Sequence, residues 1–76
     1  MSKKVFMVEF LFNFSDGASE LVPVGIFSSE AMARTVAFDK AEELKDKEGI
    51  SSMFITKFEL DKDETMELVE EYYFNN

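Results

Sequence analysis

The sequence contains no cysteine and no histidine. Without cysteine, the chain can form neither a disulfide nor a thiolate metal site. Without histidine, it lacks the most common general base and the most common ligand of transition metals. These two absences exclude most of the side-chain chemistry on which catalytic and metal-binding sites depend.

Glycine and proline are scarce, with three glycines and one proline in the chain. Gly17, Gly25 and Gly49 lie too far apart to form a phosphate-binding loop. No segment approaches the roughly 20 apolar residues that a membrane-spanning helix needs. The apolar stretch after the first lysines is interrupted by Glu9 and has no small-residue cleavage site, so we predict no signal peptide and expect a cytoplasmic location.

The length of 76 residues predicts a single domain over residues 1–76. A core of this size contributes only a few kcal/mol, and small domains often compensate by self-association. The chain is rich in aromatic residues, with nine phenylalanines and two tyrosines. This composition predicts either a core dominated by rings or a partly exposed aromatic surface.

The first half of the chain has the pattern of a β-hairpin. Residues 5–14 alternate strictly between the two sides of a strand. One side would carry Phe6, Val8, Phe10, Phe12 and Phe14, and the other Met7, Glu9, Leu11 and Asn13. Residues 15–17 are typical of a turn, and residues 21–27 are expected to form the return strand. Pro23 lacks an N–H and Gly25 follows it closely, which predicts a sheet edge or a bulge.

A helix is expected next, beginning at Ser28-Ser29-Glu30 and extending to about residue 48. A serine hydroxyl can cap the first amides, and Gly49 is the residue type expected just after a helix. A face rich in small residues would let this helix lie close to a sheet. That face consists of Ala33, Ala37, Ala41 and Leu44.

Residues 53–60 are expected to form a third strand, with Phe54 and Phe58 on one side and Met53 and Ile55 on the other. The remaining segment fits two structures. Leu68, Tyr72 and Phe74 would share one side of a fourth strand, whereas Met66, Val69 and Tyr73 would share one side of a short helix. We favour the strand. The predicted fold is α+β: a small antiparallel sheet in the order β-β-α-β, followed by a strand or short helix, with one helix packed on one face.

The junction between the second strand and the helix resembles that of small uncharacterised bacterial and phage α+β domains. The resemblance rests on Gly25-Ile26-Phe27-Ser28-Ser29 with Ala33 early in the helix, and on the strand ending Glu59-Leu60-Asp61. It covers about half of the chain. It implies this fold and a prokaryotic or phage setting, and it implies no catalytic residues.

The charge is strongly acidic and unevenly distributed. Sixteen acids and eight bases give a net charge of −8. Residues 59–76 contain seven of the acids and one of the bases, so they carry −6 of this total (1 − 7). Charge of this sign repels nucleic acids and anionic membranes. It favours a protein partner with a basic surface.

The acidic segment begins with the spacing of a calcium-binding loop, Asp61-x-Asp63-x-Thr65. Such a loop needs glycine at its sixth position and a bidentate acid at its twelfth, where this chain has Met66 and Tyr72. We therefore predict neither metal nor cofactor. With no histidine beside any serine and no pattern of a buried catalytic acid, we also predict that the chain is not an enzyme.

The remaining hypothesis is binding to another protein. Phage inhibitors of restriction or CRISPR nucleases are similar to this chain in being small, acidic and without catalytic groups. In that interpretation the acids would occupy a basic surface of a nucleic-acid-handling protein, and the terminal aromatic residues would anchor the contact. The alternatives are an antitoxin or immunity protein, or a structural module that forms homodimers. The predicted partner-binding residues are Asp61, Asp63, Glu64, Glu67, Glu70, Glu71, Tyr72, Tyr73 and Phe74.

Overall fold

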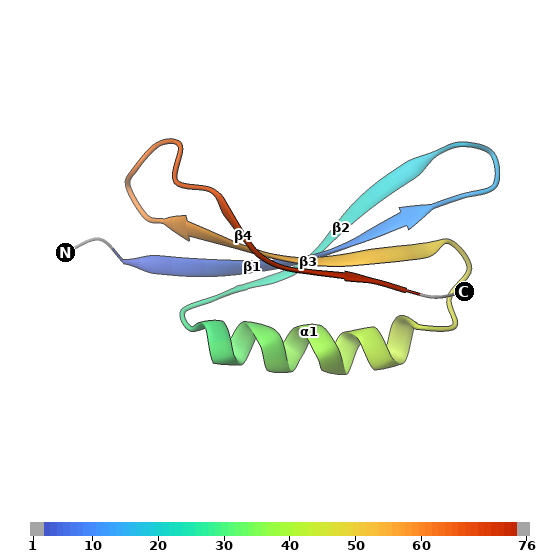
Figure 1. The fold of residues 1–76 in the computed structure, drawn as a ribbon, viewed down its shortest axis with the longest axis horizontal. Helices are drawn as coiled ribbons and strands as arrows, with labels where there is room; N and C mark the ends of the chain where they lie inside the picture. The colour runs from blue at the N-terminus through green and yellow to red at the C-terminus, as the bar shows by residue number, and fades with distance from the viewer. Residues whose placement is uncertain (1–2, 75–76) are drawn as a thin grey trace.

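A computed structural model describes residues 3–74, which form four strands and one helix (Figure 1). In chain order these are β1 (Lys4–Asn13), β2 (Ser19–Phe27), α1 (Glu30–Leu44), β3 (Ile50–Glu59) and β4 (Glu67–Tyr73). The predicted α+β class is confirmed. The C-terminal segment, which fitted either a strand or a helix, is the strand β4.

The strands form one antiparallel sheet in the order β2-β1-β3-β4, so β1 and β3 are central and β2 and β4 are edges. Helix α1 packs against β1, β2 and β3. Figure 1 shows α1 along one face of the sheet, while the β1–β2 and β3–β4 hairpins rise away from it at opposite ends. Among residues 3–74, no element covers the opposite face, which we call the bare face.

The alternation in β1 has the predicted consequence. Phe6, Val8 and Phe10 are buried on the side that faces α1, and the residues between them lie on the bare face. Phe14, beyond the end of β1, is 39% exposed and stacks on Phe12 with ring centroids 6.1 Å apart. The buried stripe therefore ends before the alternating pattern does.

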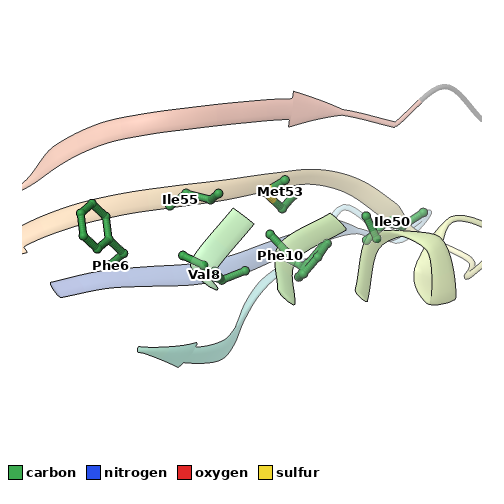
Figure 2. Packing of buried hydrophobic residues seen from close by; sticks show 9 residues of the cluster. Phe6, Val8, Phe10, Ile50, Met53 and Ile55 are labelled. Carbon is green, nitrogen blue, oxygen red and sulfur yellow. The ribbon is translucent and has the colours of Figure 1, made fainter. Parts of the chain in front are cut away.

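The core lies between α1 and the two central strands. Figure 2 shows Phe10 of β1 beside Met53 of β3, with turns of α1 in front of them. Ala33, Ala37 and Ala41 are the buried residues of the helix, as the small-residue face predicted. Small side chains allow the helix backbone to lie close to the sheet, so the larger side chains of the strands fill the space between them.

The irregularity predicted around Pro23 and Gly25 is present. Gly25 pairs with Val8 and Pro23 pairs with Glu9, so Val24 is an extra residue in β2. This bulge lies in an edge strand, where the missing N–H of proline is tolerated. The sequence predicted either a sheet edge or a bulge at Pro23, and the structure has both.

The predicted end of the helix was wrong. Helix α1 ends at Leu44, and β3 begins at Ile50 instead of residue 53. The intervening residues form turns, and Gly49 has a φ of 88°, a conformation that favours glycine. The Gly49 carbonyl accepts a hydrogen bond from the Asn13 amide at 2.7 Å. The chain leaves the helix earlier, where the Lys47 amide donates a hydrogen bond to the Leu44 carbonyl at 2.9 Å, three residues back instead of four.

The predicted apolar side of the fourth strand was also wrong. Glu70 pairs with Ile55, but Leu68 pairs with Thr56, so Val69 is an extra residue in β4. This bulge reverses the alternation. Tyr72 and Phe74 lie on the helix side, whereas Leu68 lies on the bare face and is 53% exposed.

The Ser29 hydroxyl caps α1 by accepting a hydrogen bond from the Met32 amide at 3.1 Å. Replacing Ser29 with alanine is expected to lower the free energy of unfolding by about 1 kcal/mol, because a first-turn amide loses its partner. Urea denaturation followed by circular dichroism measures this change. Ser28→Ala is the matched control, because Ser28 makes no side-chain hydrogen bond within residues 3–74. Equal losses in the two variants would contradict the capping role.

Candidate protein-binding surface

The acidic segment is divided between a turn and a strand. Asp61, Asp63 and Glu64 lie in the β3–β4 turn, where all three are exposed and none forms an ion pair with a residue in 3–74. The turn is closed by Thr65, whose hydroxyl accepts a hydrogen bond from the Glu59 amide at 2.9 Å. These three acids therefore form one uncompensated negative group at one end of the molecule.

Glu67 and Glu70, by contrast, are paired on the helix side of the sheet. Lys57 Nζ lies 2.6 Å from Glu67 Oε2, and this hydrogen bond lowers the pKa of the Glu67 carboxyl and raises the pKa of Lys57. Arg34 lies 3.0 Å from Glu70 and also 3.0 Å from Glu30, so it links α1 to β4. These two acids are held by the domain's own bases, and the predicted nine-residue site is not one continuous patch.

The Glu67–Lys57 ion pair predicts how the stability of the domain changes with pH. Because the pKa of Glu67 is lowered on folding, its contribution is complete above the ordinary glutamate pKa of about 4.3 and is lost as the pH falls through the lowered value. The difference in urea midpoint between wild type and Glu67→Gln is expected to be constant from pH 7 to about 5 and to shrink below about 4. Glu20→Gln, at an exposed and unpaired acid of β2, is the control and should show a smaller change. A difference for Glu67→Gln that persists undiminished at pH 3 would contradict the pairing.

The three terminal aromatic residues are also separated. Tyr72 contacts Phe38 of α1 edge-to-face at 5.9 Å, and Phe74 lies 6.2 Å from Phe10. Tyr73 points to the bare face and is 63% exposed. The prediction that at least one of these rings projects outward is confirmed.

Two small hollows lie on the surface of the described residues. One of about 130 Å³ lies between Phe38, Tyr72 and Phe74, and another of about 230 Å³ lies beside Phe12 and Phe14. Pockets that enclose a small organic ligand are typically about 300 Å³ or larger. Neither of these two hollows is large enough to enclose such a ligand.

The bare face is rich in apolar residues. Opposed residues in an antiparallel pair share a face, so the register assigns its members. Leu21, Ile26, Leu68 and Tyr73 are each more than half exposed there. The complete apolar set is Val5, Met7, Leu11, Leu21, Pro23, Ile26, Phe54, Phe58, Leu68 and Tyr73. The sequence indicated this surface, because β1 and β3 have apolar residues on both of their sides. The predicted partner-binding site nevertheless did not include any residue of β1 or β3.

Within the four strands, the charged residues on the bare face are all acidic. In the four strands the bases are Lys4 and Lys57, and the register places both on the helix side. Glu9 and Glu71 lie on the bare face, where both are opposite Phe54, one on each neighbouring strand. The neighbouring Glu71 carboxylate interacts with the Tyr73 hydroxyl and raises the pKa of Tyr73. Glu9 is half-buried, and its side chain has no polar partner within residues 3–74.

Two further features bear on function. Among residues 3–74, no three acidic side chains are grouped so that they could hold a metal ion. In the same part of the chain, no helix has the length and apolar character needed to cross a membrane. Comparison with known proteins adds no relative: no family model, no curated protein and no solved structure matches this chain.

Proposed function

We propose that this chain is a protein-binding protein that acts by association and not by catalysis. The observation that carries the proposal is the bare face, an apolar sheet surface with no covering layer among residues 3–74. The molecule exposes 5278 Å², whereas a compact protein of 8.8 kDa exposes about 4800 Å². Large contiguous apolar patches on small proteins typically mark interaction sites.

The charge supports a basic partner. The net charge is −8, and the turn acids Asp61, Asp63 and Glu64 are not neutralised by any base within residues 3–74. Such a field speeds association with a positively charged protein and disfavours acidic ones. Nucleic-acid-handling proteins have basic surfaces, so an inhibitor that occupies such a surface, including a phage inhibitor of a nuclease, is the specific role that we propose.

The bare face also favours a second candidate, a structural module that forms homodimers through this surface. Light scattering at high protein concentration separates the two candidates. A dimer that dissociates when Ile26, 65% exposed on the bare face, is replaced with aspartate would support the homodimer. A monomer would leave the face free for a different protein.

Capture of a partner from extracts of the native host, with two variants of equal charge, tests the proposed function. The first neutralises the turn (Asp61→Asn, Asp63→Asn, Glu64→Gln), and the second neutralises exposed acids of the helix side (Asp39→Asn, Glu43→Gln, Asp46→Asn). Asparagine tolerates the positive φ of residue 61. We expect the turn variant to weaken binding at least about ten-fold more than the helix variant, and salt to weaken the wild type. Binding that is indifferent to salt and to both variants would rule out a basic partner.

A further inference from the structure

The centre of the bare face combines one aromatic ring with two carboxylates. Glu9 on β1 and Glu71 on β4 are both opposite Phe54 on β3, so the three residues form one row across adjacent strands. Adjacent strands are about 4.8 Å apart, which places the backbones of the two glutamates about 10 Å apart on either side of the ring. We call this row the central row.

We infer that the bare face binds a partner segment that is apolar and places one arginine side chain on the central row. This inference rests on the proposed protein-binding function and adds the chemistry of the partner. A guanidinium can lie over an aromatic ring while its N–H groups reach carboxylates at the side. The central row offers both kinds of contact to one planar cation.

The state of the two carboxylates supports this assignment. Glu9 is half-buried without a polar partner in residues 3–74, so its charge remains available to an incoming base. Glu71 lies on the edge strand β4, so its carboxylate can be approached by a partner. A charged acceptor within a face that becomes dry on binding needs a charged donor, because an unpaired buried charge is very costly.

The same charges argue against a second copy as the occupant. Two bare faces packed together would enclose four carboxylates, Glu9 and Glu71 from each copy. The strands contribute no base to this face, because Lys4 and Lys57 lie on the helix side. Enclosing uncompensated like charges opposes such packing, whereas a partner with an arginine relieves it.

The size of the face is adequate for a specific complex. Four strands about 4.8 Å apart and about 33 Å long, the length of the ten residues of β1 and of β3, give an area of about 600 Å². A standard protein interface buries about 800 Å² on each partner. The apolar residues of the face would supply the contact area, and the central row would determine which segment binds.

A library of random twelve-residue peptides, displayed and selected against the wild-type chain, provides the probe. We expect selected peptides to contain arginine among apolar residues. The synthetic form of the best peptide should bind Glu9→Gln/Glu71→Gln at least about ten-fold more weakly, as measured by fluorescence anisotropy. It should bind Phe54→Leu more weakly as well, because the ring is lost. The matched control, Glu20→Gln/Glu43→Gln, removes the same charge away from the bare face and should bind like the wild type.

Several outcomes would overturn the inference, and they differ from failure of the proposed function. Suppose that Ile26→Asp abolishes peptide binding while Glu9→Gln/Glu71→Gln leaves the affinity unchanged. The face would then bind proteins without an arginine on the central row. If no peptide is selected, and the wild-type chain is a dimer that Ile26→Asp dissociates, the occupant of the bare face is a second copy of the chain. If Glu9→Gln/Glu71→Gln turns a monomer into a dimer and the peptides contain no base, the acids serve only to prevent self-association.

Discussion

Replacing Phe10 with alanine is expected to cause the largest loss of stability, about 3–5 kcal/mol. Phe10 is fully buried at the centre of β1, opposite Met53, and lies 6.2 Å from Phe74. Truncation of a buried phenylalanine costs about 3–5 kcal/mol, because apolar contact is lost and a cavity remains. A domain of 76 residues has a total stability of roughly 4–11 kcal/mol, so the loss ranges from about a quarter of the total to all of it.

Circular dichroism in increasing urea measures this effect. Phe14→Ala makes the same chemical change at a ring that is 39% exposed beyond the end of β1. We expect it to cost less than half as much as Phe10→Ala, because solvent already reaches that ring. Similar losses for the two phenylalanines would contradict the assignment of the core to the helix side of β1.

Replacing Ala37 with leucine is expected to have the second-largest effect. Ala37 is fully buried in the middle of the alanine face of α1, where it packs against the sheet. Three added carbon atoms have no space there, so the helix must move outward or the strand side chains must leave their preferred rotamers. Overpacking of this kind costs about 1–3 kcal/mol.

Ala31→Leu is the matched control, because Ala31 is exposed on the same helix. Alanine and leucine have similar helix propensities, so the intrinsic cost of the two substitutions is nearly equal. The difference between their urea midpoints therefore isolates the packing of α1 against the sheet. If Ala37→Leu proved as stable as Ala31→Leu, the close approach of helix and sheet would be wrong.

The small alanine face and the bare face are two consequences of the same architecture. Helix α1 covers one side of a four-stranded sheet, and its buried residues are all alanines, so the larger buried side chains of β1 and β3 fill the core. The other side has no second layer among residues 3–74. A partner that covers the bare face would therefore complete a second apolar layer, and we expect it to raise the stability of the domain by linkage.

Local patterns predicted much of the fold. Alternation over residues 5–14 and turn residues at 15–17 predicted the first hairpin, and Ser29 predicted the beginning of the helix. These features depend on neighbours in the sequence, where side-chain periodicity and capping act over a few residues. Element ends were predicted less well. Helix α1 stops at Leu44, and the turn after it leads to Gly49, whose carbonyl accepts a hydrogen bond from Asn13 at the end of β1, a contact between distant segments.

The candidate site was only partly predicted. The sequence correctly indicated an acidic segment and an aromatic residue that projects outward, but it treated residues 61–74 as one site. The bulge at Val69 and the partners Lys57 and Arg34 divide that segment between two faces and a turn. A bulge and an ion pair depend on which strand lies alongside, and no local pattern in β4 specifies its neighbour.

By itself, the sequence determined the α+β class, the acidic charge and the lack of cysteine and histidine chemistry. Only the tertiary structure decided which apolar side of each strand is covered. Met53 and Ile55 face the helix, while Phe54 and Phe58 face outward, although both pairs are strongly apolar. The tertiary structure also placed Glu9, Phe54 and Glu71 in one row, although they are far apart in the chain. The physical reason is that register and helix placement are collective properties of the packed sheet, whereas periodicity shows only that a strand has two sides.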